Sequence, residues 1–294
     1  DRLKTLDLYD KALIALVGDH GEMLGEHGEN SHAFFIYHNV LRVPMMFKLP
    51  GAIQSRKITE PCSIIDVMPT IMSLAGLDPL ESIQGIDLSN YLRPDFSLPN
   101  RAIFAESMTP TAYNCNSLLG LVMGRWHYIQ STRPELYDRL KDPVELNNLM
   151  EQFPAQAQKM SDRLIHLLAE TDHSDSDNTA ELSPEVLEQL ASLGYLDDNI
   201  VLDYTLQSDK EDAKDMINVR NQIMHAMNIA RTGQRDLAFK VYTEIIQQYP
   251  KVPETYRILA AFHLKGGELD EAEIALKHLL TLTPTDRSSL NKLM

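Results

Sequence analysis

The sequence has little cysteine, a deficit of basic charge and no long hydrophobic run. Its 294 residues include two cysteines, Cys62 and Cys115, whose spacing fits neither a disulfide scaffold nor a paired zinc site. Its 27 basic side chains are outnumbered by 42 acidic ones, which argues against a nucleic-acid partner, because binding a phosphate backbone requires clustered Lys and Arg. No apolar run approaches the roughly 20 residues that span a bilayer. No signal peptide is recognisable at Asp1, so the compartment is left open, a periplasmic or secreted location included.

The acidity is concentrated in one segment. Residues 172–215 hold 13 acidic and 2 basic side chains, a composition that predicts a solvated acidic linker. Inside it, residues 183–194 begin with Ser-Pro and end with Gly. These are the cap signals of a helix, so a short amphipathic helix is predicted there.

The residues after the linker, 216–294, carry a repeat of 34 residues. The matching pairs are Ala226 and Ala260, Gly233 and Gly267, Ala238 and Ala272, and Pro250 and Pro284. Small residues allow two helices to approach closely, glycine ends the first helix and proline the second. The pattern predicts helices near 217–231, 236–248, 253–265 and 270–281, with another starting near Arg287. This period is typical of tetratricopeptide repeats, two plus the start of a third, which bind proteins or peptides; the alternative is a plain pair of helical hairpins.

Residue types that can ligate a metal cluster near the amino terminus. The apolar run 12–17 predicts a strand buried on both faces, as in a parallel sheet covered by helices. Asp19 and His20 follow this strand between glycines. Sites of open α/β sheets lie beyond the carboxyl ends of strands, and glycines permit the tight turn that brings both side chains to one ion. We therefore predict that Asp19 and His20 ligate a metal.

Histidines cluster in the same region. Four of the ten, His20, His27, His32 and His38, lie between residues 20 and 38. For His38 we expect a surface or packing role, and the role of His27 is left open.

Five segments together resemble the sulfatase family of the alkaline-phosphatase superfamily. The segment VGDHGEMLGEHGE resembles the second metal motif of that family, and SHAFFIYHNVLRVPMMFKLPG the segment that follows it, with Arg42-Val43-Pro44 leading into a strand. CSIIDVMPTIMSLAGL resembles the family's helix, QGIDLSNYL its next signature, and ELYDRLKDPVELNNLM its closing hairpin. The resemblance covers roughly residues 1–197 and extends to sulfatases fused to tetratricopeptide repeats.

The resemblance and the local patterns together predict a fold. It is an α/β protein with a partial alkaline-phosphatase-like sheet in residues 1–98. A small antiparallel sheet and a helix near 153–170 are expected in residues 99–171, and the all-α tetratricopeptide segment follows the linker. In the helix near 66–76 we expect Asp66 to be the cap, Gly76 to follow the end, and Met68, Ile71, Met72 and Leu74 to form the core stripe. Trp126, His127 and Tyr128 are expected to pack the antiparallel sheet.

The resemblance also implies a reaction. Sulfatases hydrolyse sulfuric esters with a formylglycine nucleophile and a divalent ion that binds the sulfate oxygens. By position, Asp19 and His20 match the later pair of metal ligands. The expected ion is calcium, with manganese or zinc as alternatives because imidazole is a ligand. His32 stands where the family has a basic residue that contacts sulfate and the leaving oxygen, so it is the expected catalytic residue.

Two features of the family pattern do not occur in this sequence. Neither cysteine begins a Cys-x-Pro-x-Arg motif, and the early acidic ligand pair is missing. The chain therefore matches the second half of a catalytic domain, and we expect it, alone, to be inactive and to bind metal weakly. Two alternatives stay open: a phosphodiester or phosphonate monoester hydrolase of the same superfamily, and a non-catalytic adaptor that binds through the repeats.

Overall fold

The computed structural model describes residues 2–51, 55–78, 80, 83–93, 96–171 and 206–293. The short helix predicted at 183–194 lies outside the described residues. The amino-terminal region contains α1 (Arg2–Thr5), β1 (Ile14–Val17), the 3-10 helix η1 (Glu26–Gly28), α2 (His38–Leu41), β2 (Met45–Lys48), η2 (Ile64–Asp66), α3 (Val67–Leu74) and η3 (Ser89–Leu92). The middle region contains β3 (Ala102–Ser107), η4 (Thr109–Tyr113), β4 (Leu118–Met123), β5 (Trp126–Gln130), β6 (Glu135–Asp138) and α4 (Pro154–Thr171).

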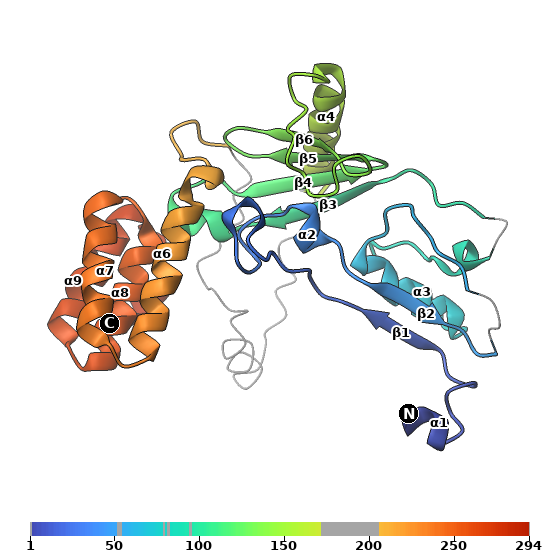
Figure 1. Ribbon diagram of the computed structural model, residues 1–294, viewed down its shortest axis with the longest axis horizontal. Coiled ribbons are helices and arrows are strands. Elements are labelled where there is room, and N and C mark those ends of the chain that lie inside the picture. Colours follow the sequence, from blue (N-terminus) through green and yellow to red (C-terminus); the bar gives the residue numbers. More distant parts are fainter. Residues whose placement is uncertain are drawn as a thin grey trace.

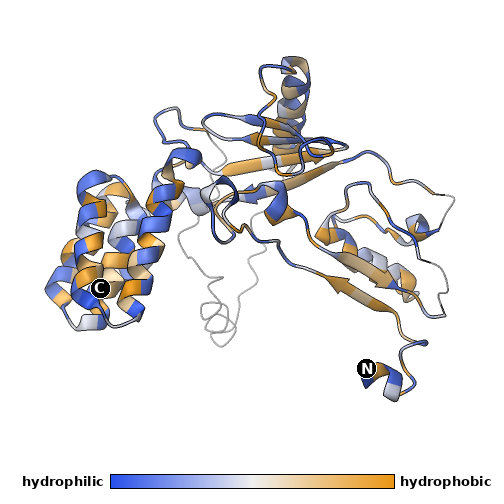
Figure 2. Cartoon of the chain, in the orientation of Figure 1, coloured by the Kyte–Doolittle hydropathy of each residue, from blue (hydrophilic) through white to orange (hydrophobic). Residues whose placement is uncertain are grey.

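The first strand was predicted to be buried in a parallel sheet, and this prediction is wrong for the described residues. β1 pairs antiparallel with β2, Ile14 opposite Lys48 and Val17 opposite Met45. Leu16 and Val17 are 50% and 42% exposed, although apolar residues run along both strands (Figure 2). The apolar composition was read correctly, but the partner that burial requires is a matter of tertiary context, which the run of residues does not encode.

α3 forms where the sequence predicts it, with Asp66 at its N-cap position, but its buried residues are not those of the expected stripe. Ser63 and Asp66 form a reciprocal capping box at η2, so the Asp66 carboxylate accepts from the backbone before the helix. Pro69 and Thr70 are buried, whereas Met68, expected in the core stripe, is 55% exposed. Thr70 Oγ1 accepts from the backbone N–H of Leu88 at 2.8 Å. The face of α3 that is buried is therefore the one on which the loop around Leu88 packs.

The predicted antiparallel sheet is confirmed and has strand order β3-β4-β5-β6. Side chains alternate between its faces, as strand geometry requires. One face packs on α4 through Leu119, Leu121, Tyr128 and Leu136, which contact the helix at Ala157, Met160 and Leu164 (Figure 1). The opposite face, with Leu118, Ile129 and Tyr137, packs on the segment 34–37. The sheet is thus the platform that carries the segment after η1.

The carboxy-terminal region is helical and close to the predicted pattern. It contains α6 (Ala213–Arg231), α7 (Arg235–Gln248), α8 (Pro253–Gly266), α9 (Leu269–Leu282) and α10 (Arg287–Leu293). Gly233 and Gly267 follow α6 and α8 with φ of +84° and +75°, a conformation that glycine adopts without steric cost. Among the described residues, no helix is long and apolar enough to cross a membrane.

The equivalent small residues of the two repeats lie where helices touch. Ala226, Ala238, Ala260 and Ala272 are all at most 1% exposed. Tyr242 and Leu276, at the matching large apolar position, are likewise buried. α6 packs on α7 and α8 packs on α9, so each 34-residue unit is a pair of helices in contact.

The helical region shares its core with the amino-terminal region. Met216, Ile217 and Ile223 of α6 belong to the same buried cluster as Phe34 and Phe35. In Figure 1, α6 lies against the loop that precedes α2 and against the end of the β-sheet. Residues 206–212, which the sequence assigns to the linker, also contact the sheet: the backbone N–H of Gln207 donates to Asn116 Oδ1 at 2.9 Å.

Candidate functional site

The loop after β1 is held tightly by backbone contacts. The Gly18 N–H donates to the Pro44 carbonyl at 3.0 Å, and the Gly21 N–H donates to the Val40 carbonyl at 2.7 Å. A Cβ at Gly21 would lie 2.0 Å from the Asn39 carbonyl oxygen, so only glycine fits there without movement of the backbone. This packing fixes the two residues between the glycines, Asp19 and His20.

Asp19 and His20 lie side by side and are accessible. Asp19 Oδ2 is 3.9 Å from His20 Nε2, and their side chains are 77% and 39% exposed. The His20 backbone N–H donates to Asp19 Oδ1 at 2.9 Å, and this bond lowers the pKa of Asp19, with the nearby His20 ring contributing. The carboxylate is therefore ionised at neutral pH, as a metal ligand must be.

A backbone carbonyl selects the tautomer of His20. Its Nδ1 is 2.8 Å from the Gly21 carbonyl oxygen. Since a carbonyl only accepts, Nδ1 carries the proton and Nε2 holds the lone pair. Histidine metal ligands commonly donate their other ring N–H to a carbonyl or carboxylate in this way.

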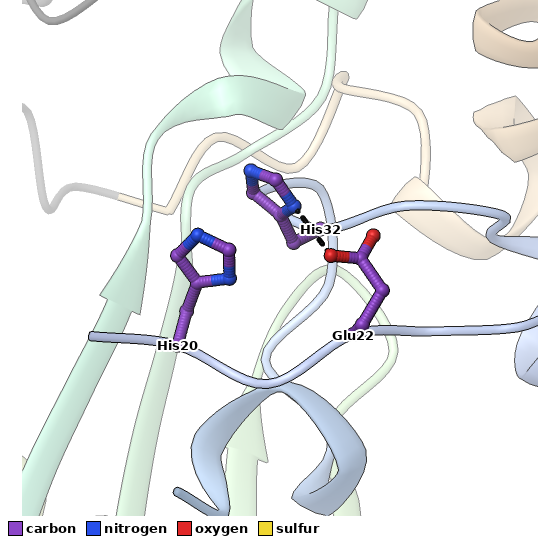
Figure 3. Close-up of side chains that lie close together, drawn as sticks. All are labelled: His20, Glu22 and His32. Carbon is purple, nitrogen blue, oxygen red and sulfur yellow. Dashed lines mark hydrogen bonds and ion pairs between the residues drawn. The ribbon is translucent and has the colours of Figure 1, made fainter. Parts of the chain in front are cut away.

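His32 reaches the same place from a loop further along the chain. Its ring stacks on His20 with centroids 3.9 Å apart and an interplanar angle of 28°. Its Nδ1 lies 3.0 Å from Glu22 Oε2, and Figure 3 shows the two histidines and Glu22 converging from two loops. The predicted catalytic residue and the predicted metal ligands are thus together.

Glu22 was not singled out from the sequence. It lies two residues after His20, and its role becomes visible only when the loop at residues 29–34 folds back. Ligand atoms of His20, Glu22 and His32 all lie within 4.8 Å of one another. Two imidazoles and a carboxylate are a donor set that suits manganese or zinc, whereas calcium takes six to eight oxygen ligands.

The loop bearing His32 turns around a buried carboxylate. Glu29 is completely buried and accepts from the backbone N–H groups of Phe34 at 3.1 Å and Phe35 at 3.0 Å. Ala33 has φ +80°, a conformation uncommon for a residue with a Cβ. The turn returns His32 toward His20 while Phe34 and Phe35 enter the core.

The other two histidines of the cluster have packing roles. His27 stacks on Tyr37 with centroids 3.6 Å apart, and its Nε2 lies 2.9 Å from the Val144 carbonyl. The His38 backbone N–H donates to Glu145 Oε2 at 2.8 Å, and burial lowers the pKa of its ring. The packing role expected for His38 agrees with these contacts.

Neither cysteine belongs to this site. Cys115 is buried, and burial raises the pKa of its thiol to about 12. Cys62 is half-buried before η2, and burial raises the pKa of its thiol too. A raised thiol pKa disfavours the reactive thiolate, so both have the character of structural residues.

The closing hairpin of the sheet supports the segment from the other side. Glu135 accepts from the hydroxyl groups of Tyr37 and Tyr137, the latter at 2.6 Å. Burial, followed by the charge of Glu135, raises the pKa of both phenols. These bonds join the hairpin motif of residues 135–150 to the segment that leaves the His32 loop.

The fold is a mixed α/β arrangement in which a four-stranded antiparallel sheet is covered on one face by α4. The chain belongs to the family of N-sulphoglucosamine sulphohydrolase carboxy-terminal domains, whose family model matches residues 25–173. That range includes His32, while Asp19 and His20 precede it.

Individual relatives agree with the family. Arylsulfatase K of Gallus gallus is 28% identical over 168 residues, which cover 54% of this chain and 31% of the relative. Choline-sulfatase of Rhizobium meliloti (strain 1021) is 34% identical over 155 residues, or 51% of this chain and 29% of the relative. The chain therefore spans about three tenths of the length of these curated relatives. The solved structure of the phosphonate monoester hydrolase of Agrobacterium radiobacter is 25% identical, with a TM-score of 0.48 over 57% of this chain and 37% of its own.

Proposed function

We propose that this chain is the carboxy-terminal part of a metal-dependent sulfuric ester hydrolase, in which Asp19 and His20 bind a divalent ion and His32 acts on the ester. The observation that supports it best is the stacking of His20 and His32 at 3.9 Å beside the Asp19 carboxylate. The sulfatase relatives and the family membership support the class of reaction.

The residues fit a divalent ion. Asp19 offers an ionised carboxylate, and His20 offers the Nε2 lone pair that the Gly21 carbonyl leaves available. When bound, such an ion neutralises sulfate oxygens and favours nucleophilic attack. For the whole protein, with the early acidic ligands of the family, we propose calcium. The donors of this chain by themselves suit manganese or zinc better.

His32 has the chemistry of a group that contacts the ester oxygen. With Nδ1 held by Glu22 at 3.0 Å, Nε2 is the ring nitrogen left available to a substrate. A protonated imidazole there donates a hydrogen bond to a sulfate oxygen and a proton to the leaving oxygen. Glu22 orients the ring and stabilises the imidazolium, as carboxylates do beside histidine bases.

Titration of the 294-residue chain with Mn²⁺, Zn²⁺ and Ca²⁺ tests the metal site. Binding should be lost in Asp19→Ala and His20→Ala and kept in Asp209→Ala, which removes an exposed carboxylate of another region. Equal affinity in all four proteins would contradict the proposal.

Activity is tested separately with chromogenic sulfate and phosphonate esters. Alone, the chain should show no turnover above its His20→Ala control, because it contains no nucleophile motif. In a protein extended through the amino-terminal half of the family fold, His32→Ala should lower kcat about 10²–10⁴-fold. Preference for the phosphonate ester would favour the alternative of a phosphodiester or phosphonate monoester hydrolase. Inactivity of a protein with an intact nucleophile motif would favour the alternative of a non-catalytic adaptor.

For the helical region we propose tetratricopeptide repeats that bind a protein or peptide. The 34-residue spacing of buried alanines and of the positive-φ glycines supports this assignment. Exposed apolar side chains, among them Leu237, Phe239 and Ile274, are available for contact. Peptides selected on the chain from a random library should lose affinity for a Phe239→Ser variant; unchanged affinity would remove this face from the proposal.

A further inference from the structure

The loop that bears His32 is closed by a residue from the helical region. Arg220 of α6 donates from Nη1 to Ser31 Oγ at 3.0 Å and from Nη2 to the His32 carbonyl at 3.0 Å. One side chain therefore hydrogen-bonds both to the His32 carbonyl and to the side chain of the preceding residue, Ser31. The fork of the guanidinium makes this two-point contact possible, and a lysine could not reproduce it.

The positive charge of Arg220 also faces the buried carboxylate of Glu29 in this loop. Its Nη1 lies 3.5 Å from Oε1 of the buried Glu29, around which the loop turns. Its guanidinium also lies over the Phe34 ring, 5.6 Å from the centroid. The Arg220 side chain is only 10% exposed, and a buried carboxylate without a cationic partner is strongly unfavourable. Arg220 thus stabilises the turn itself.

Neighbouring residues of α6 extend the contact. Asn221 Nδ2 donates to the Gly28 carbonyl at 2.7 Å. A Cβ at Gly28 would lie 3.5 Å from Ile217 Cγ2, so the helix packs directly on the loop. The helix is in turn anchored at its start, where the Asp212 carboxylate accepts from the backbone N–H groups of Lys214 at 3.0 Å and Arg133 at 2.8 Å.

These contacts come from outside the sulphohydrolase family range. The family match ends at residue 173, and α6 begins at Ala213. The repeat region is therefore more than a tail, because it completes a loop of the catalytic part.

We propose that Arg220 is a positioning residue for His32, so that α6 is a working part of the proposed hydrolase site. This inference rests on the proposed function for the role of His32, and it goes further by giving the helical region a part in building the site. Whatever displaces α6, including a partner bound to the repeats, would change the placement of His32.

The test compares Arg220→Lys and Arg220→Met with Arg231→Met, which removes an exposed arginine from the same helix. All are made in the 294-residue chain. Two measurements report on the loop: hydrogen exchange of amides 29–35, and the ¹⁵N shifts of the His32 ring, which show whether one tautomer is held. Unfolding by urea and exchange in β4 and β5 report on the rest of the protein.

In both Arg220 variants we expect exchange at 29–35 to rise about tenfold and the ring shifts of His32 to move toward those of an unrestrained imidazole. β4 and β5 should stay protected in Arg220→Lys, which keeps a charge near Glu29. Unchanged His32 shifts in both variants would overturn the proposal, as would an increase in exchange no larger than in Arg231→Met. A metal titration of the same samples and of His20→Ala separates the two ideas: equal binding by wild type and His20→Ala with an intact Arg220 effect refutes the proposed metal site, and the reverse result refutes the positioning role.

Discussion

Glu145 and His127 form a buried pair that ties the closing hairpin to the sheet. Glu145 Oε1 lies 2.7 Å from His127 Nδ1, and the two side chains are 0% and 1% exposed. The other carboxylate oxygen accepts from the backbone N–H of His38. One side chain therefore connects the hairpin motif, β5 and α2.

We expect Glu145→Gln to lower the free energy of unfolding by about 2 kcal/mol, because hydrogen bonds to a charged, buried acceptor are replaced by weaker ones. Urea denaturation monitored by circular dichroism measures the change. The matched control is Glu151→Gln on the exposed surface, for which we expect little effect. Equal losses in the two variants would show that the pair contributes nothing specific.

The attachment of α6 should depend on pH through Asp212. Burial acts to raise the pKa of this carboxyl, but Lys214 and its backbone N–H, together with Arg133, outweigh burial and hold the pKa below the ordinary 3.8. A lowered pKa means that the folded state favours the ionised form, so the stabilisation is complete above the unfolded pKa. It is lost as the pH falls below about 3.8 and through the folded pKa.

Asp212→Asn should therefore cost about 2 kcal/mol of unfolding free energy at pH 7 and progressively less below pH 3.8. Urea unfolding of both proteins as a function of pH measures this difference. Asp209→Asn, at an exposed position, serves as the control. A difference between wild type and Asp212→Asn that does not shrink in acid would contradict the assignment.

The two cysteines should differ in reactivity. Burial raises the pKa of Cys115 to about 12, so at pH 8 its thiolate is scarce and sheltered. We expect a disulfide reagent to label one thiol slowly in the folded protein and both in urea. Cys62→Ser should abolish labelling of the folded state, and labelling that persists in this variant would place Cys115 within reach of solvent.

Gly21 should be needed for the geometry of the site. A methyl group there meets the Asn39 carbonyl at 2.0 Å, whereas a methyl group at Gly18 meets Pro44 Cδ at 3.2 Å. We expect Gly21→Ala to weaken Mn²⁺ binding by tenfold or more, because losing the groups that orient a metal ligand typically costs about 10–100-fold in affinity. Gly18→Ala should have the smaller effect, and calorimetric titration compares them. The opposite order would mean that the loop does not set the ligand geometry.

Local pattern predicted much of this fold. The antiparallel sheet, α4 and the helices of the repeat region were all expected, because strand alternation, glycine turns and helix caps act over a few residues. The positions of α6 and α7 differ from expectation only at their ends: α6 begins at Ala213 instead of 217. Asp212 caps this helix. Its cap signal was missed because residues 172–215 were assigned to an acidic linker.

Contacts between segments that lie far apart in the chain could not be predicted from the sequence. Asp19 and His20 adjoin in the chain, so their proximity could be predicted, and His32 was reached through the family resemblance. Glu22 and Arg220 were not found, because their roles exist only after the His32 loop folds back and α6 docks on it. The exposure of β1 was missed for a related reason: burial depends on neighbours that no strand specifies for itself.

The core common to Phe34, Phe35 and the α6 residues Met216, Ile217 and Ile223 sets a limit on how the chain can be divided. A cut at the end of the family range, residue 173, separates two halves of one hydrophobic core. The piece that ends at residue 173 would present the Phe34 and Phe35 rings to water and self-associate. The range that the sequence family covers and the hydrophobic core therefore have different ends in this protein.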